Sequence, residues 1–530
     1  MKNVNSMLRL VIVFSMIHQL SSAQNSGIIS DYCYGGSMDD YLVRLKDIQG
    51  IQNINLIAPG YTGSSNGTIS GNAGANDAWL LGVDNSYSVV ISETTGGNQN
   101  EYATDCVADL VNGIAVIGQG FSSQLGNHGG GDILLYTRDN NGNTINQKYI
   151  GGTLEDRGVR LLFDAASSRY IALANIKSTD GDISGLTHHG QSDIGVFELD
   201  LSYNITNSFL IGSSGFDIVK DAYLDNNDLY IMGETDGNNF DFSGTTANGS
   251  DDIFVKKYNT LNWTVQATYR YGGNDTDHGN KFIFEPGSGF TITGSTRSTN
   301  YGGCFLGQTN GIVINCNLSG QTNWVKCIEG SDDDILVAGT YSPAYPNVYF
   351  VSGYSLSVDG HFNVPGFGNW DCFMAALDEN NSGSLLWLKK YGGSGIDIAD
   401  DMLQPASGPI VTLNHTNSTD GNVTSFNHGL FEAWIVVPDN PTALNNVQPG
   451  VTSLMVYPNP ANNFITVHVP GLPSANVKYE VTDLTGKAVA NGKETGNTFT
   501  IPVHQIAKGY YLIRVSCDSG QWLDRFTVER

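Results

Sequence analysis

Two signatures recur seven times along most of this chain at an almost constant spacing. Copies of the first, a Gly-Gly motif best seen in Tyr-Gly-Gly-Ser at residues 34–37, lie 55 to 63 residues apart. They fall at Gly35, Gly96, Gly151, Ile211, Gly272, Glu329 and Gly392. Copies of the second, an acidic or small residue before an apolar run, begin at Asp77, Asp132, Asp193, Asp252, Gly311, Asp371 and Glu432. Two signatures that keep one period indicate seven copies of one structural unit.

Each unit is predicted to contain four short strands. In the fourth copy, the strand candidates are residues 216–224, 228–235, 251–258 and 263–271. Asn, Asp and Gly fill the connections, as expected of turns. Four strands repeated seven times are typical of a β-propeller, whereas solenoid repeats are shorter, about 20–47 residues. The predicted fold class is therefore all-β, with a seven-bladed β-propeller.

The two ends of the repeat array predict that the ring closes. A strand candidate at residues 26–34 precedes the first Gly-Gly motif, while the last copy ends after its third strand at residues 431–439. The N-terminal strand can complete the seventh blade by pairing with residues 433–437, which would remove two exposed strand edges.

The first 23 residues have the pattern of a secretory signal peptide. Lys2 and Arg9 precede an apolar run at residues 10–17, and small residues lead to an expected cleavage between Ala23 and Gln24. The apolar run is too short to span a bilayer, and no other segment is apolar for long enough. We therefore expect no membrane span in the mature chain.

A change of composition predicts a second folded domain. The expected order is a signal peptide at 1–23, the propeller at 24–438, a linker at 439–450 that is rich in Asn and Pro, and a small C-terminal β-sandwich at 451–530.

Charge and cysteine content limit the partners. The chain has 26 Lys and Arg against 52 Asp and Glu, a net charge of −26, which argues against nucleic acid or anionic lipid. Seven cysteines in an exported chain favour disulfides with at least one thiol left over. Cys304, Cys316 and Cys327 cluster in one unit, their pairing is left open, and their spacing is not a zinc pattern.

Several motifs of the tail resemble the C-terminal (type A) sorting domain of type IX secretion cargo in Bacteroidetes. They are Tyr-Pro-Asn-Pro at 457–460, Thr-Asp-Leu-Thr-Gly-Lys at 482–487, the segment 506–515 and a final basic residue. The resemblance assigns the sorting motif to Tyr457, Pro458, Asn459, Pro460, Gly486, Lys508, Gly509 and Tyr510. It implies recognition by the type IX secretion machinery, passage through the outer membrane, and either release or attachment at the outer cell surface.

The repeats themselves resemble the YGGS-type propeller repeats of such secreted proteins. Residues 178–193 match that pattern best. The pattern implies no particular activity.

Candidate chemistry recurs with the repeat, which favours structural roles. His128, His189 and His428 each precede an acidic residue by four positions, and such a pair could serve acid–base catalysis, but a catalytic dyad is needed only once. Asp-Gly pairs at 180–181, 236–237 and 420–421 offer oxygen ligands for calcium, although turn formation alone accounts for them. We predict no catalytic, cofactor-binding or metal-binding residue.

The leading functional expectation is a non-enzymatic secreted or cell-surface propeller that binds a glycan or a surface protein in adhesion. The alternatives are an extracellular carbohydrate-active or other hydrolytic enzyme that uses the central mouth of the ring, and a structural coat component. An aromatic-rich stretch at 342–368 is predicted as an insertion. Packing of its aromatic residues on one another is the favoured interpretation, and recognition of a sugar or a protein surface is the alternative.

Overall fold

The computed structural model divides the chain into two compact units, Met1–Asp439 and Asn440–Arg530. The described residues are 28–48, 51, 53–109, 113–139, 143–304, 308–342, 345–363, 366–406, 408–425, 429–438, 455–457, 461–468, 476–483, 487–517 and 520–529. Within them the elements are strands and five short 3-10 helices: η1 (Ser123–Leu125), η2 (Gly181–Ile183), η3 (Phe240–Phe242), η4 (Gly360–Phe362) and η5 (Glu379–Asn381). In this part of the chain, no helix has the length and apolar character needed to cross a membrane.

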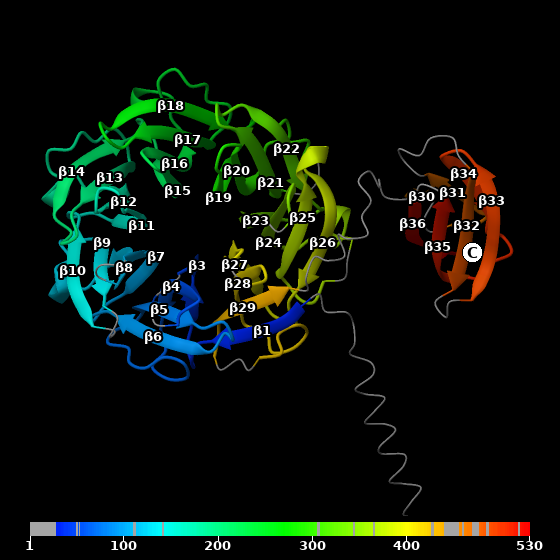
Figure 1. Cartoon of the computed structure of the whole chain (residues 1–530), viewed down its shortest axis with the longest axis horizontal. Helices are drawn as coiled ribbons and strands as arrows, with labels where there is room; N and C mark the ends of the chain where they lie inside the picture. Colours follow the sequence, from blue (N-terminus) through cyan, green and yellow to red (C-terminus); the bar gives the residue numbers. More distant parts are fainter. Residues whose placement is uncertain are drawn as a thin grey trace, which may run out of the picture. The chain divides into compact units, whose positions relative to one another are not determined.

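The first unit consists of seven antiparallel sheets, which we number 1 to 7 along the chain and which lie one after another around a ring (Figure 1). Sheet 1 comprises β2 (Asp40–Leu42), β3 (Lys46–Asp47), β4 (Leu56–Thr62), β5 (Asp77–Val83) and β6 (Val89–Thr95). Sheet 2 comprises β7 (Glu101–Asp109), β8 (Gly113–Gly120), β9 (Asp132–Arg138) and β10 (Thr144–Ile150). Sheet 3 comprises β11 (Asp156–Asp164), β12 (Arg169–Ile176), β13 (Asp193–Leu199) and β14 (Ile205–Ile211).

The remaining four sheets repeat the same order of strands. Sheet 4 comprises β15 (Asp217–Asp225), β16 (Asp228–Thr235), β17 (Asp252–Asn259) and β18 (Thr264–Tyr271). Sheet 5 comprises β19 (Asp277–Glu285), β20 (Gly289–Thr296), β21 (Asn310–Asn317) and β22 (Thr322–Ile328). Sheet 6 comprises β23 (Asp334–Tyr341), β24 (Val348–Ser355), β25 (Asp371–Asp378) and β26 (Ser384–Tyr391). Sheet 7 comprises β27 (Asp397–Leu403), β28 (Val411–Thr416), β29 (Glu432–Pro438) and β1 (Ile28–Tyr34).

The predicted pairing between the two ends of the array is present. Strand β1 runs antiparallel to β29, with Tyr32 opposite Ile435 and Tyr34 opposite Ala433, and Figure 1 shows the blue β1 beside the orange β29. The Asp31 carboxylate also accepts hydrogen bonds from Ser425 Oγ (2.8 Å) and Trp434 Nε1 (3.1 Å). The N-terminal strand is therefore the outermost strand of sheet 7.

Apolar side chains fill the spaces between successive sheets. Ile171 of sheet 3 and Ile231 of sheet 4 belong to one such cluster. Sheet 7 packs against sheet 1 in the same manner, because Leu413 and Ile435 share a cluster with Trp79. Every sheet of this kind buries both faces, which explains why the third strand of each repeat is an almost continuous apolar run.

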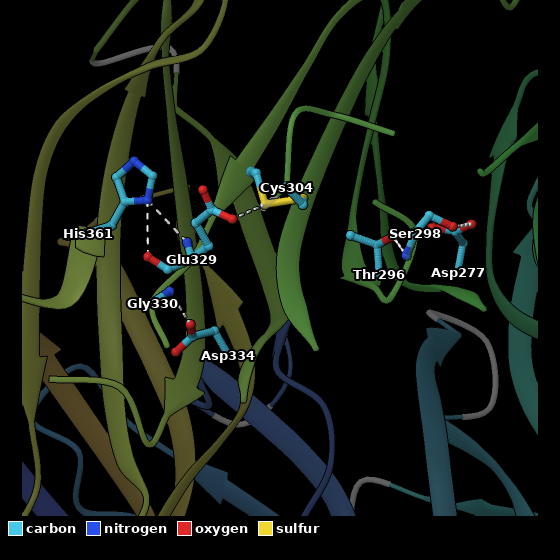
Figure 2. The surroundings of a disulfide bond; sticks show 9 residues. Asp277, Thr296, Ser298, Cys304, Glu329, Gly330, Asp334 and His361 are labelled. Atoms are coloured by element: carbon cyan, nitrogen blue, oxygen red, sulfur yellow. Dashed lines mark hydrogen bonds between the residues drawn. A yellow bond between two sulfur atoms is a disulfide. The ribbon is translucent and has the colours of Figure 1, made fainter. Parts of the chain in front are cut away.

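A buried carboxylate at the start of each innermost strand explains the Gly-Gly signature. The seven anchor carboxylates, all 0% exposed, are Asp40, Glu101, Asp156, Asp217, Asp277, Asp334 and Asp397. Each accepts the backbone N–H of the residue four positions earlier at 2.6 to 3.0 Å. Figure 2 shows two of them, Asp334 with the N–H of Gly330 and Asp277 with the Ser298 hydroxyl.

The first glycine of the motif lies against two carboxylates, which leave no room for a side chain at that position. A Cβ at Gly272 would come within 2.3 Å of Asp252 Oδ1 and 2.8 Å of Asp277 Oδ2. The same geometry corrects one position of the repeat. Because Ser213 donates its N–H to Asp217, the residue equivalent to Gly35 is Gly212 rather than Ile211.

The prediction of an insertion at 342–368 is wrong. Residues Val348–Ser355 form β24, a regular second strand that pairs with β23 and β25. Tyr349 and Phe350 are fully buried within it. A proline-containing connection and many aromatic residues obscure an ordinary copy of the repeat here.

The second unit contains two further antiparallel sheets around one apolar core. One sheet has the order β30 (Met455–Tyr457), β31 (Phe464–His468), β34 (Thr498–Pro502). The other has the order β33 (Ala488–Thr495), β32 (Asn476–Asp483), β35 (Gly509–Cys517), β36 (Gly520–Val528). Residues such as Ile465, Phe499 and Ile513 form the core between them.

Candidate functional site

At one position of each sheet the side chains differ from sheet to sheet, although the backbone around them repeats. It consists of the residue after each anchor carboxylate and the residue opposite it on the second strand. We call this layer the mouth. From sheet 1 to sheet 7 its pairs are Tyr41/Tyr61, Tyr102/Gln119, Arg157/Asn175, Ile218/Glu234, His278/Ser295, Ile335/Tyr354 and Ile398/His415. Positions that the repeat holds in place but fills differently are candidates for recognition rather than folding.

Half-buried aromatic rings form a continuous arc over sheets 2, 1 and 7 of the mouth. Its members, in spatial order, are Phe121, Tyr102, Tyr61, Tyr41, Phe431 and His415. The ring centroids of successive members lie 4.8 to 6.1 Å apart. Contacts such as Tyr61 with Tyr102 and Tyr41 with His415 cross from one sheet to the next. We call these six residues the aromatic arc.

The carboxylate of Asp400 lies beside this arc. Its Oδ2 is 2.8 Å from His415 Nδ1. Burial raises the pKa of Asp400, and His415 offsets part of that effect. Burial also raises the pKa of Tyr61 to about 12, and Tyr102 and Asp400 add to the shift. Burial is the main cause that raises the pKa values of Tyr41 and Tyr354, and the charge of Asp400 adds to both shifts. Asp400 therefore acts on tyrosines of sheet 1 and of sheet 6.

The opposite side of the mouth is polar. Glu234 is almost fully buried, and its carboxylate lies 3.1 Å from Lys220 Nζ and 3.2 Å from His278 Nδ1. The hydrogen bond to Glu234 raises the pKa of His278. The mouth is therefore asymmetric, with aromatic residues on sheets 7, 1 and 2 and paired charges on sheets 4 and 5.

Alternating charges form a floor below the mouth. The residue four positions after each anchor carboxylate is, from sheet 1 to sheet 7, Arg44, Asp105, Arg160, Asp221, Lys281, Ala338 and Asp401. Two of their contacts pass over intervening sheets: Arg44 Nη1 of sheet 1 lies 3.3 Å from Asp221 Oδ1 of sheet 4, and Lys281 Nζ of sheet 5 lies 2.6 Å from Asp401 Oδ1 of sheet 7. Arg160 Nε of the neighbouring sheet 3 lies 2.8 Å from the same Asp221 atom. These residues are three positions further along the strand than the mouth, which is about 10 Å at 3.3 Å per residue.

Ion pairing holds Asp105 of the floor in its charged form. Burial alone would raise the pKa of Asp105, but Arg160, Lys46 and Arg44 outweigh it and lower the pKa. Backbone N–H groups of Leu161 and Leu45 satisfy Asp105 and Asp401 at 3.0 and 2.8 Å. Removing one member of such a network would leave an uncompensated buried charge.

The recurrent histidines lie at equivalent positions but do not form equivalent pairs. His128 Nδ1 is 2.8 Å from Asp132 Oδ2, whereas the ring of His189 packs against Phe240. The shared contact is between backbone and carboxylate, since both histidines donate their N–H to the following acid at 2.7 Å. His428 lies outside the described residues.

The Asp-Gly carboxylates bind backbone N–H groups of the neighbouring Gly-Gly turns. Asp180 accepts from Thr153 N at 2.8 Å, Asp236 from Phe216 N at 2.8 Å, and Asp420 from Ser394 N at 2.6 Å. These contacts satisfy the turns, as expected if the Asp-Gly pairs serve turn formation.

Two of the three clustered cysteines are joined. Cys304 and Cys327 form a disulfide, and Cys316 is buried with a free thiol. Glu329 Oε2 lies 3.8 Å from Cys327 Sγ (Figure 2). The cluster of Cys304, Cys327 and Glu329 has the spacing of a metal site, but sulfur atoms in a disulfide are not thiolate ligands.

The residues of the predicted sorting motif fall partly within the second unit's strands. Tyr457 ends β30, Gly509 begins β35, and Lys508 precedes it. Tyr510 is 68% exposed on β35. Pro458, Asn459, Pro460, Gly486 and the predicted cleavage pair Ala23 and Gln24 lie outside the described residues, and the role of the motif residues stays a prediction.

The sequence contains the signal that would have identified the mouth. Aligning the copies on the anchor carboxylate rather than on Gly-Gly places Tyr41, Tyr102 and Arg157 in one column. The partners Tyr61 and His415 become visible only once strand register is known.

The fold and the tail together define the class of this protein: an all-β chain of repeated four-stranded sheets with a secretion domain. Residues 455–529 match the family described as the secretion system C-terminal sorting domain. The chain is thus cargo of type IX secretion, delivered to the extracellular space or the cell surface. No curated protein matches the chain.

Three solved structures resemble this chain weakly in sequence and in fold. BamB from Moraxella catarrhalis is 12% identical with a TM-score of 0.35, covering 77% of this chain and 98% of its own. The plexin A4 extracellular region is 7% identical with a TM-score of 0.46, covering 94% of this chain and 62% of its own. Puromycin hydrolase is 11% identical with a TM-score of 0.41, covering 83% and 62%. At these scores the likenesses carry no functional argument.

Proposed function

We propose that the first unit is a closed seven-bladed β-propeller. Three observations support this: seven sheets follow one another around a ring, successive sheets share apolar clusters, and sheet 7 packs on sheet 1. The N-terminal strand β1 completes the last blade by pairing with the outer edge of β29.

We further propose that this propeller is a non-enzymatic binding module that acts in adhesion at the cell surface. The observation that carries the proposal is the mouth, where one repeated backbone position holds a different side-chain pair in every sheet. The floor of paired charges fills the axis beneath it, so a partner would engage the mouth from outside rather than enter the ring. The partner is a glycan or a surface protein.

We propose that the two ends of the chain direct its export. A signal peptide cleaved between Ala23 and Gln24 would bring the protein to the periplasm, and the second unit would then be recognised by the type IX machinery. Deletion of residues 451–530 in the native bacterium should leave the protein in the periplasm, as judged by immunoblots of cell fractions. Finding the shortened protein outside the cell would contradict this assignment.

Attachment assays with whole cells test the proposed adhesion function. Cells that lack the gene should attach less to surfaces or to neighbouring cells than the parent strain, and the purified mature protein should restore attachment. The same protein should release no sugar or peptide from polysaccharide and protein substrates. Catalytic turnover would favour the hydrolase alternative, and unchanged attachment would contradict the adhesion role.

A further inference from the structure

We propose that the aromatic arc and Asp400 form a binding site for a neutral saccharide chain. The inference rests on the proposed function, because it names the ligand of the same mouth. It follows from the shape of the arc, the place of one carboxylate beside it, and the pairing of the charges around it.

The arc supplies a row of partly exposed aromatic side chains that a pyranose ring can contact. Tyr41 and Tyr61 are stacked with centroids 5.0 Å apart, and Tyr102 meets Tyr61 edge-on at 4.8 Å. All three are partly exposed. Aromatic rings of this type combine a large apolar face with a polar tip, which suits the alternating C–H and hydroxyl surfaces of a sugar.

Asp400 supplies a directional acceptor beside this surface. An ionised carboxylate accepts several hydrogen bonds through two oxygens, and His415 holds one of them at 2.8 Å. Binding sites for small ligands commonly combine aromatic walls with a few fixed polar groups of this kind. Sugar hydroxyl groups would donate to Asp400 while the ring stacks on the arc.

The paired charges of the mouth favour a neutral ligand, with Arg157 on sheet 3 as the one mouth cation that forms no ion pair among the described residues. Asp400 is already paired with His415, and Glu234 with Lys220 and His278, so a cationic ligand would have to displace existing partners. A polyanion would meet the field of a chain with a net charge of −26. Neither argument disfavours an uncharged saccharide.

The test is calorimetric titration of the mature full-length protein with neutral hexasaccharides of β-1,4-glucan, β-1,4-xylan and β-1,4-mannan. A galacturonate hexamer and a chitosan hexamer serve as the anionic and cationic comparisons. We expect at least one neutral chain to bind, and Tyr61→Ala or Tyr102→Ala to weaken that binding by about tenfold or more. Tyr61→Phe should retain binding, since it keeps the ring.

Tyr223→Ala is the matched control, because Tyr223 is a half-exposed tyrosine at the far end of an innermost strand, stacked on Phe284. It should bind as the wild type does, and unchanged circular dichroism should accompany every variant. Exclusive binding of the charged hexamers, or full affinity in both alanine variants, would overturn the inference. If no neutral chain binds but attachment still requires the protein, the saccharide site is wrong while the adhesion role stands.

Discussion

At the residue scale, a single carboxylate per repeat organises each turn between sheets. The anchor Asp277 receives the N–H of Gly273, the Ser298 hydroxyl and the Thr296 hydroxyl while fully buried. A buried carboxylate is stable only where hydrogen-bond donors satisfy it. Each repeat therefore needs this acid and its donors as much as it needs the glycines. The sequence shows both positions, but only the fold shows that they contact each other.

Asp31 has the same role where the N-terminal strand meets sheet 7. Its carboxylate accepts from Thr424 N (2.9 Å), Ser425 N (3.1 Å), Ser425 Oγ (2.8 Å) and Trp434 Nε1 (3.1 Å). Burial opposes its ionisation, but hydrogen bonds from the hydroxyl groups and backbone N–H groups of Thr424 and Ser425 outweigh burial and lower the pKa of Asp31. Its contribution to stability is therefore present above its unfolded pKa and is lost as the pH falls.

Asp31→Ala should lower the free energy of unfolding by about 1–3 kcal/mol, the range for hydrogen bonds to a charged group at a partly exposed site. Urea unfolding of the mature protein at pH 7 measures this. Asp84→Ala is the control, since Asp84 accepts only from Ser86 and Ser88 within its own turn among the described contacts. Equal loss in both variants would contradict a specific role for Asp31.

At the element scale, strand positions follow closely from the sequence, because alternating and apolar runs report directly on burial. All four predicted strands of sheet 4 lie within one residue of β15 to β18. The stretch around Val348–Ser355 shows where this fails. Its strand pattern is regular, but the aromatic residues in and around the strand suggest an insertion. Only the pairing with β23 and β25 shows its place in the repeat.

The disulfide is an element-scale feature that spacing could not assign. Cys327 lies in β22, and Cys304 lies in the connection between β20 and β21. Reduction, or the double substitution Cys304→Ala with Cys327→Ala, should lower the free energy of unfolding by about 2–4 kcal/mol. Reductant should have no further effect on the double variant.

Thiol labelling provides the check on this disulfide. The protein without reductant should react at five cysteines once unfolded, namely Cys33, Cys106, Cys316, Cys372 and Cys517. Labelling of all seven cysteines would show that the bond does not form.

At the scale of the whole molecule, the buried anchors predict an unusual pH dependence. Burial is the main cause that raises the pKa values of Asp40, Asp277 and Asp397, and it raises that of Asp334 to about 6. The unfolded value is about 3.9. An acid with a raised folded pKa binds its proton more tightly in the folded state, so stability rises as the pH falls from about 6 toward 4.

Other groups alter this trend in known directions. The carboxyls of Asp105 and Asp221, whose pKa values are lowered, are ionised in both states above pH 5 and add no slope there. The raised pKa of His278 adds stability below about 6.5 and acts in the same direction, whereas the lowered pKa of His361 opposes it.

We therefore expect the midpoint of urea unfolding to be higher at pH 5 than at pH 7.5. Tryptophan fluorescence measures the unfolding transition. Asp334→Asn should reduce the gain on acidification. A midpoint that falls between pH 7.5 and pH 5 would contradict the assignment of buried anchor carboxyls.

The repeated sheets and the pairing of β1 with β29 were predictable from the repeat and from its unequal ends. Only part of the mouth was predictable in the same way. Aligning the anchor carboxylates identifies the position of Tyr41, but its contacts with Tyr61 and His415 depend on strand register and on two sheets that are far apart in sequence. The same holds for the floor, where Arg44 meets Asp221 across 177 positions. The sequence of each repeat determines the fold of that repeat. Contacts across the ring depend in addition on how many repeats the ring contains.

Closure of the ring by the N-terminal strand is the central claim, and hydrogen–deuterium exchange of the mature protein tests it most directly. In a closed ring, the amides of β1 exchange as slowly as those of β14 and β18, which hold the same outermost position in sheets 3 and 4. Exchange of β1 within seconds, at the rate of an unpaired segment, would contradict closure.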